Sequence, residues 1–170
     1  MIDMYKIIGA KGKISNINKF LEKINSFCEK KNIVIQVFNA DMIFGNNHLV
    51  SAYEHAKRAF EQKTNTTNSL AMEILLYASG ERQLKLAIPK IGIKKGQVDV
   101  AFIFIGDKIT DKLIDELLQE LSLKRDDEVL EGDIITLKKF GLKEIELKTV
   151  SKDKYGSLIL EKIALVDIIK

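Results

Sequence analysis

The sequence predicts one α+β domain spanning residues 1–170, in which a small mixed β-sheet packs against several α-helices. Three observations predict this class. Short runs rich in β-branched residues occur between longer segments whose apolar residues recur every three or four positions, the patterns of strands and helices respectively. The 170 residues are 46% hydrophobic and 30% charged, a composition typical of one globular core. The chain also shows no linker, internal repeat or low-complexity tract that would divide it.

The first forty residues predict a strand, a helix and a second strand. Residues 4–9 and 33–39 are short and rich in β-branched side chains, which is typical of strands. Between them, apolar residues from Ile17 onward recur at helical spacing, and Ser15 precedes them as a candidate helix cap. Cys28 lies on this apolar stripe, so we interpret it as a small core residue rather than a catalytic thiol.

Three helices are predicted in the middle of the chain. The first covers about residues 48–62 and carries an apolar stripe that includes three alanines. The second covers residues 70–79, is apolar around most of its circumference and is followed by Gly80, so we expect it to be buried and to end there. A short third helix over residues 81–91 is predicted to bend or end near Pro89.

The last part of the chain predicts one strongly buried strand. Residues 98–105 are apolar on both faces over most of their length and predict a central strand of the sheet. The last helix leaves Leu160 and Ile168 outside its apolar stripe, as apolar surface beyond what one small core absorbs. The remaining predicted elements are a helix over 111–121, a solvated loop at 124–128, a short helix after Asp133 that stops at Gly141, a candidate strand over 144–150 and a helix over 155–169.

Composition and charge restrict the function classes. A formal net charge of +3 is too small for general binding of polyanions, so any contact with nucleic acid must come from local clustering. Such a cluster exists, because the stretch 82–98 carries five basic residues and no acidic one, whereas 107–133 carries ten acidic residues and four basic ones. The sequence therefore predicts two electrically different faces.

The compartment is predicted to be the cytoplasm. The single cysteine excludes an internal disulfide framework and Cys-based zinc fingers, and it suits a reducing environment. The longest charge-free apolar runs are far shorter than the roughly 18 residues of a membrane span. The first residues lack the basic start and long apolar centre of a signal peptide. We expect a soluble protein without a membrane partner.

No motif in the sequence predicts catalysis. Gly9 and Gly12 follow a predicted strand, as the glycines of a phosphate-binding loop do. Only two residues separate them where that loop needs four, and Ile14 follows Lys13 where the loop needs serine or threonine. An ordinary turn between a strand and a helix explains this stretch better than nucleotide hydrolysis.

The two histidines, His48 and His55, lie seven residues apart on one predicted helix, about 10 Å from each other. One metal ion cannot bridge that distance, and no third ligand follows at zinc spacing, so neither a metal nor another cofactor is predicted. Helix packing, hydrogen bonding and contact with RNA all stay open for these side chains. An acid-base role would need a carboxylate or a nucleophile placed beside them by the fold.

Glu73 is the single charged residue of the apolar helix, and a buried carboxylate is costly unless it has a partner. Arg82, just after the helix, is the partner that the sequence suggests. Two interpretations stay open at this point. The two residues form a structural ion pair, or Glu73 orients the guanidinium of Arg82 toward a phosphate.

Three segments in the middle of the chain carry a resemblance. They are Asn39-Ala-Asp-Met-Ile43, His48-Leu-Val-Ser-Ala-Tyr-Glu-His-Ala-Lys-Arg-Ala-Phe60 and Leu70-Ala-Met-Glu-Ile-Leu-Leu-Tyr-Ala-Ser-Gly-Glu-Arg-Gln83. The chain resembles the kinase-binding, tRNA-recruiting subunit of the KEOPS complex, called the PRPK-binding protein in animals. The likeness is specific over residues 36–92, and the flanks agree in element order and length. The lysine- and isoleucine-rich composition resembles that of an archaeal member.

The resemblance implies an adapter without catalytic activity of its own. Members of this family bind the amino-terminal lobe of a small kinase-like ATPase, stimulate it, and hold the single-stranded CCA end of tRNA. The assembly installs threonylcarbamoyl on the adenosine beside the anticodon, and a different, metal-containing subunit carries out the transfer. The missing catalytic motifs of this chain agree with that division of roles.

The resemblance and the residue patterns meet at the turn that follows the apolar helix. A fixed turn beside a basic stretch is suited to gripping a short single strand through phosphate contacts and base-edge hydrogen bonds. For the kinase we predict a separate, partly apolar surface on the last helix, at Leu160 and Ile168. The predicted tRNA-binding residues are Lys57, Arg58, Asn65, Arg82, Gln83, Lys85, Lys94 and Lys95.

Two alternative functions stay open at the level of sequence. The first is an independent enzyme acting on nucleotides or RNA through His48 or His55 and a nearby carboxylate. The second is a protein-only adapter that never contacts RNA. Both differ from the predicted tRNA-binding adapter in what the isolated chain binds or turns over.

Overall fold

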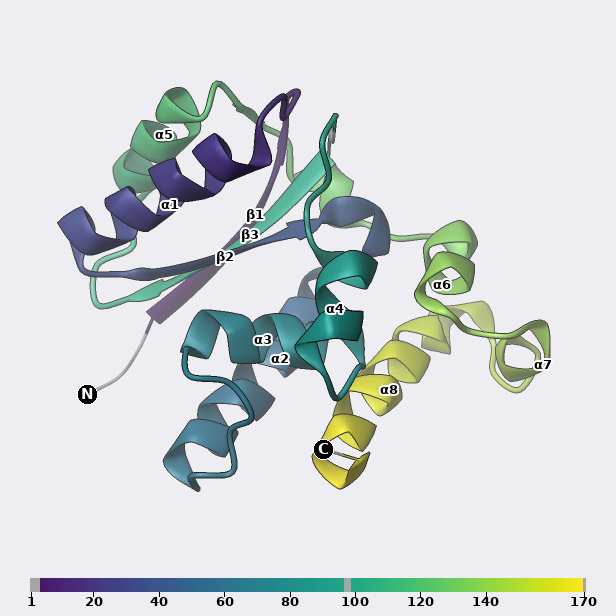
Figure 1. Ribbon diagram of the computed structural model, residues 1–170. Helices are drawn as coiled ribbons and strands as arrows, with labels where there is room; N and C mark the ends of the chain where they lie inside the picture. Colours follow the sequence, from purple (N-terminus) through teal and green to yellow (C-terminus); the bar gives the residue numbers. More distant parts are fainter. Residues whose placement is uncertain (1–3, 97–98, 170) are drawn as a thin grey trace.

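Residues 4–96 and 99–169 are described by a computed structural model (Figure 1). In these residues one sheet is present, with strand order β2-β3-β1-β4. The predicted α+β class is confirmed, but the sheet is not mixed, because each of its ladders is antiparallel. The strands are β1 (Met4–Lys11), β2 (Val34–Asn39), β3 (Asp99–Gly106) and β4 (Lys124–Arg125).

The predicted strand-helix-strand opening is present as β1, α1 (Ile17–Lys31) and β2. Both strands pair antiparallel with β3, so they run parallel to each other with β3 between them, a split βαβ arrangement. This order explains why the most apolar run of the sequence lies in the centre of the sheet. Val98, which was predicted to begin that strand, lies outside the described residues.

The sheet separates two apolar clusters because alternate residues of β3 point to opposite faces. Val100, Phe102 and Phe104 pack with α1 and α5 (Asp111–Glu120), which cover one face in Figure 1. Ala101 and Ile103 pack with the helices on the other face. The predicted central position of this strand is therefore confirmed.

The second face of the sheet carries the helices that form the candidate site (Figure 1). Three follow one another along the chain, as predicted, and the last helix of the chain packs against two of them. They are α2 (Asn46–Glu61), α3 (Leu70–Ser79), α4 (Leu84–Ile91) and α8 (Tyr155–Ile169). Pro89 lies in the last turn of α4, which ends two residues later.

Shorter helices complete the described chain. Those on the carboxy-terminal side are α6 (Ile134–Phe140) and α7 (Glu144–Leu147), which precede α8. The single-turn helices are η1 (Ala40–Met42), η2 (Asp127–Leu130) and η3 (Lys152–Lys154). None of the helices in the described part of the chain has the length and apolar character needed to cross a membrane.

Three local predictions were wrong. The cap of α1 is Asn16 rather than Ser15, since its side-chain oxygen accepts a hydrogen bond from the N–H of Lys19 at 3.0 Å. The region 124–128, predicted as a loop, begins with β4 and continues into η2. The predicted strand 144–150 is instead α7, where the Glu146 side chain caps the helix start at 3.1 Å from the Lys143 nitrogen.

Candidate functional site

The centre of the candidate site is the turn between α3 and α4. The α3 residues from Glu73 to Ser79 are all buried, so the core holds the end of this helix in place. Gly80 ends the helix in the left-handed conformation, at φ 71°, and its N–H donates to the Tyr77 carbonyl at 3.0 Å. The Ser79 hydroxyl donates to the Leu76 carbonyl at 2.7 Å and accepts from the Glu81 N–H at 3.0 Å, which directs the chain away from the helix.

Glu73 is fully buried, and its partner is not Arg82. Its carboxylate accepts hydrogen bonds from the N–H groups of Thr66 and Thr67 at 2.8 to 3.1 Å and from the Thr67 hydroxyl at 2.8 Å. The predicted ion pair is therefore wrong, because within the described residues Glu73 organises the loop that precedes α3 while Arg82 faces solvent. A buried carboxylate satisfied by amide donors is a stable arrangement.

The turn presents Arg82 and Gln83 to solvent. Both side chains are exposed, and Gln83 occupies the cap position of α4 without making a capping hydrogen bond. Lys90, from the same basic stretch, is engaged within the protein. Its ammonium lies 3.4 Å from the Glu81 carboxylate and 4.0 Å from the centre of the Phe140 ring, and burial lowers its pKa.

His48 fastens the start of α2 to the end of α3. Its Nδ1 accepts from the Phe44 N–H at 3.0 Å, and its Nε2 lies 2.8 Å from the Ala78 carbonyl, which defines a neutral ring protonated at Nε2. The ring is 1% exposed and packs edge-on against Phe140, and burial lowers the pKa of His48 to about 4. Both ring nitrogens are used, so packing and hydrogen bonding explain this residue and RNA contact does not.

His55 belongs to a different contact, which joins α8 to the middle helices. Its Nδ1 lies 2.7 Å from the Asp167 carboxylate, and its ring stacks on Tyr77 at 5.4 Å between centroids. The Tyr77 hydroxyl also donates to Asp167, and burial, together with this bond, raises the pKa of Tyr77. Asp167 was not predicted from the sequence, because 112 residues separate it from His55.

The predicted tRNA-binding residues come from three parts of the chain. Arg82, Gln83 and Lys85 lie at the start of α4, and the exposed pair Lys94 and Lys95 follows its end about 12 Å further along. This second pair lies on the turn where Gly96 donates to the Ile14 carbonyl at 2.7 Å, beside the start of α1. These five residues therefore border a single helix, α4.

The other three predicted residues belong to α2 and to the loop before α3. Lys57 and Arg58 are on α2, where an Arg58 nitrogen lies 3.3 Å from His55. Asn65 belongs to the loop before α3 and donates its side-chain amide to the Thr67 carbonyl at 2.8 Å. The helix α3 itself is about 15 Å long. Its side chain therefore builds the loop that Glu73 holds.

The two residues predicted for kinase binding differ in exposure. Leu160 is half-buried and packs against the core. Ile168 is 77% exposed near the end of α8. Leu165 and Ile169, at 39% and 46% exposure, extend the same apolar end of this helix. We call the three exposed residues Leu165, Ile168 and Ile169 the α8 apolar end.

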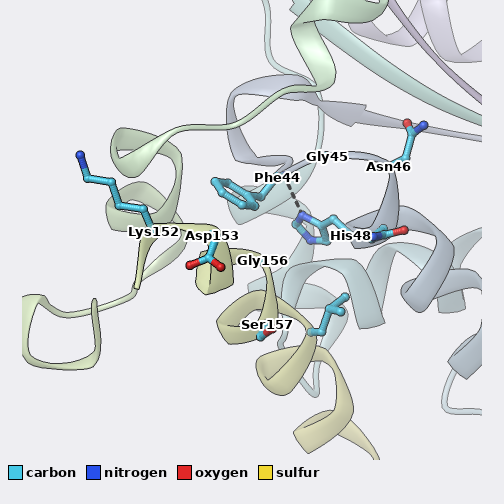
Figure 2. Close-up of a pocket in the computed structure, with 10 residues that line it drawn as sticks. Phe44, Gly45, Asn46, His48, Lys152, Asp153, Gly156 and Ser157 are labelled. Carbon is cyan, nitrogen blue, oxygen red and sulfur yellow. Dashed lines mark hydrogen bonds between the residues drawn. The ribbon is translucent and has the colours of Figure 1, made fainter. Parts of the chain in front are cut away.

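A cavity of about 390 Å³ lies where the start of α2 meets the start of α8 (Figure 2). Phe44 and His48 line one side, and Lys152, Gly156 and Leu160 line the other. Figure 2 shows the bond between Phe44 and His48 at its edge. Leu160 therefore forms a wall of this cavity. Across the described residues, His, Cys, Asp and Glu side chains nowhere gather as three or more that could hold a metal ion.

Comparisons with known proteins match most of the chain. The sequence profile of a family described as kinase binding protein CGI-121 matches residues 12–167. The chain is also similar to the regulatory protein Cgi121 of the archaeon Methanocaldococcus jannaschii, with 33% identity over 141 residues. That alignment covers 79% of this chain and 84% of the archaeal protein. The family match begins just after β1 and ends within α8, so it contains the α3–α4 turn, whereas Ile168 and Ile169 of the α8 apolar end lie just beyond it.

Proposed function

This chain belongs to the CGI-121 family of kinase-binding proteins, and we propose that it is a non-catalytic regulatory subunit of a KEOPS complex. In this role it binds the kinase-like ATPase subunit and the 3′ CCA end of tRNA. It thereby supports formation of threonylcarbamoyladenosine, which the separate threonylcarbamoyl-transferase subunit catalyses. The proposed location of this function is the cytoplasm.

The observation that carries the tRNA part of this proposal is the exposed Arg82–Gln83 turn on a buried helix. The guanidinium of Arg82 can form two parallel hydrogen bonds with a phosphate, which a lysine cannot. The amide of Gln83 offers both a donor and an acceptor to the edge of an unpaired base. Because α3 is held by the core, little backbone conformational entropy is lost when these groups bind a strand.

The two basic groups beside α4 suit a strand of a few nucleotides. Lys85 follows the turn, and Lys94 and Lys95 stand beyond the other end of the helix, about 12 Å away. A single strand lying along α4 would meet cations at both ends, with the exposed apolar side chains of Leu86 and Ile88 between them as surfaces for base contact. Such a strand needs no strong overall positive field.

The proposed mechanism is placement rather than chemistry. Binding of the tRNA tail at this chain makes the encounter of the distant adenosine with the transferase subunit intramolecular, which raises its effective concentration. For the kinase we propose the α8 apolar end as the contact surface, because Ile168 is the most exposed large apolar residue of the described chain.

A protein-only adapter is the alternative that the family description also supports. Binding of intact tRNA and of tRNA that lacks its terminal CCA separates the two. We expect the truncated tRNA to bind at least tenfold more weakly, and equal affinities would favour the protein-only adapter. His48 is a poor candidate for the catalytic histidine of an enzyme, because both of its ring nitrogens are hydrogen-bonded inside the protein.

A charge reversal at the turn tests the residue assignment. Arg82→Glu is expected to abolish tRNA binding while leaving the kinase complex intact, since Arg82 is exposed in the turn between α3 and α4 and Ile168 is on α8. Lys30→Glu, an equal change of charge at an exposed position on α1 across the sheet, is the matched control and is expected to bind tRNA almost as the wild type does. Equal losses in both variants would indicate only a general effect of charge.

A further inference from the structure

The two edges of the sheet are protected to different degrees. An unprotected edge presents backbone N–H and C=O groups that a further strand can pair with, so proteins usually cover it. On the β2 edge, the N–H of Val37 donates to the Gln36 side-chain oxygen at 2.9 Å. The Gln36 amide is in turn held by the Ala71 carbonyl at 2.9 Å. This edge is closed by its own side chains.

The other edge is covered for only part of its length. In the described chain, β4 pairs with β1 at Ala10 and Lys11, the loop after β4 extends the hydrogen bonding by one residue, and η2 also packs against β1. There the N–H of Gly9 donates to the Asp127 carboxylate at 3.0 Å, and the Gly9 carbonyl accepts from the Asp126 N–H at 2.9 Å. Gly9 is required because an added Cβ would lie 2.5 Å from the Asp126 oxygen.

Successive residues of a β-strand direct their backbone N–H and C=O groups to opposite sides, which gives the direction of these groups in the rest of β1. Because the N–H and C=O of Gly9 point away from β3, those of Ile7 and Tyr5 do so too. Lys6 and Ile8 direct their backbone groups toward β3 instead, opposite Phe104 and Phe102. Two successive pairs of donors and acceptors therefore face outward beyond the point where β4 ends.

A cavity of about 240 Å³ adjoins this open segment. Ile7, Leu130 and the start of α2 line it, together with the carboxylate residues Asp127 and Glu131. Among the described lining residues there is no basic side chain. Glu131 is exposed, whereas Asp127 already contacts Arg125 at 3.3 Å. The cavity therefore suits a positively charged side chain of a partner.

We propose that the open segment of β1 at Tyr5 and Ile7 is a docking site for an extended, basic segment of a partner protein, which adds as a strand beside β1. Backbone hydrogen bonds to Tyr5 and Ile7 supply binding, and a lysine or arginine that enters the neighbouring cavity supplies selectivity. A second copy of this chain is a poorer occupant. Pairing two β1 strands through Tyr5 and Ile7 would set Lys6 directly opposite Lys6 of the other copy.

This surface is separate from the site proposed for tRNA. Figure 1 shows the start of β1 at the rim of the sheet, away from α4, α6 and α8. Loss of strand addition would therefore leave binding of tRNA at the α3–α4 turn unchanged, and the two proposals can fail independently.

The test is a titration of the full, nitrogen-15-labelled chain with two blocked peptides, followed by NMR. The probes are acetyl-Thr-Lys-Val-Lys-Thr-amide and its charge-reversed counterpart with glutamates in place of the lysines. Before any addition, the amides of Tyr5 and Ile7 are expected to exchange with solvent much faster than those of Lys6 and Ile8. The lysine peptide at millimolar concentration is expected to shift and protect Tyr5 and Ile7, and the glutamate peptide is not.

Two pairs of variants separate backbone pairing from side-chain effects. Ile7→Pro removes the outward N–H and keeps the hydrogen bonds between β1 and β3. It is expected to weaken binding of the lysine peptide about tenfold. Ile7→Ala keeps that N–H and is the matched control, with a much smaller loss. If the proline variant does not fold, N-methylation of the peptide backbone tests the same bonds. Glu131→Lys is expected to reverse the preference between the two peptides, and Glu131→Gln to reduce it.

Several results would overturn the proposal. One is equal binding of the two peptides, and another is a shift pattern centred elsewhere than Tyr5 and Ile7. An unchanged affinity in Ile7→Pro would exclude backbone pairing. Protection of Tyr5 and Ile7 that grows with protein concentration alone would show that a second copy occupies this edge.

Discussion

Replacement of Glu73 by glutamine tests how the apolar helix is anchored. The carboxylate receives hydrogen bonds from three donors, the N–H groups of Thr66 and Thr67 and the Thr67 hydroxyl, all within 3.1 Å. Removing the charge weakens each of these bonds by roughly half, about 0.7 kcal/mol apiece. Glu73→Gln should therefore lower the free energy of unfolding by about 2 kcal/mol and the melting temperature by about 4 to 8 °C.

Urea unfolding at pH 7, followed by circular dichroism, measures this change. A double-mutant cycle with Arg82→Ala then asks whether the two residues interact. Since Arg82 is exposed and Glu73 is bonded to the preceding loop, their effects should add to within about 0.5 kcal/mol. A loss below about 0.5 kcal/mol in Glu73→Gln would refute the anchoring role, and a clear coupling energy would restore the ion pair.

Three further predictions concern other parts of the site. The pKa of His48 is about 4 in the folded chain against about 6.5 in the unfolded chain, so the unfolded chain binds more protons between these values. Stability should therefore fall by about 3 kcal/mol as the pH drops from 6.5 to 4, a slope that His48→Asn should lack in urea titrations. Gly80→Ala should cost about 1 kcal/mol at its φ of 71°, measured by thermal unfolding, and an unchanged melting temperature would contradict the left-handed stop. Ile168→Asp should weaken kinase binding at least tenfold without altering the melting temperature, and full affinity by calorimetry would exclude the α8 apolar end.

The elements with strong periodicity could be predicted from the sequence. The bounds of α3 follow from a helix that is apolar all round and ends at glycine, and α8 likewise covers the predicted residues. The error at α7 has a local cause. Ile145 and Leu147 alternate as in a strand, but the Glu146 side chain bonds to the Lys143 N–H and favours a helical turn, which leaves Ile145 73% exposed.

The partners of the charged residues could not be predicted, because they depend on contacts distant in the chain or made by the backbone. Glu73 is satisfied by backbone N–H groups, and every residue except proline carries such a donor, so no side-chain pattern reveals them. Asp167 reaches His55 only through the packing of α8 on α2. The order of the strands was likewise not deducible from their patterns.

The location of the RNA contact is the most direct test of the central claim, which is that a buried helix holds a polar turn that binds the tRNA end. The measurement is a titration of the nitrogen-15-labelled chain with a short RNA oligonucleotide that ends in CCA. We expect the largest shifts at Arg82, Gln83 and Lys85, smaller ones at Lys94 and Lys95, and none for the same oligonucleotide without CCA. Shifts centred on Lys57 and Arg58, or identical shifts for both oligonucleotides, would contradict the claim.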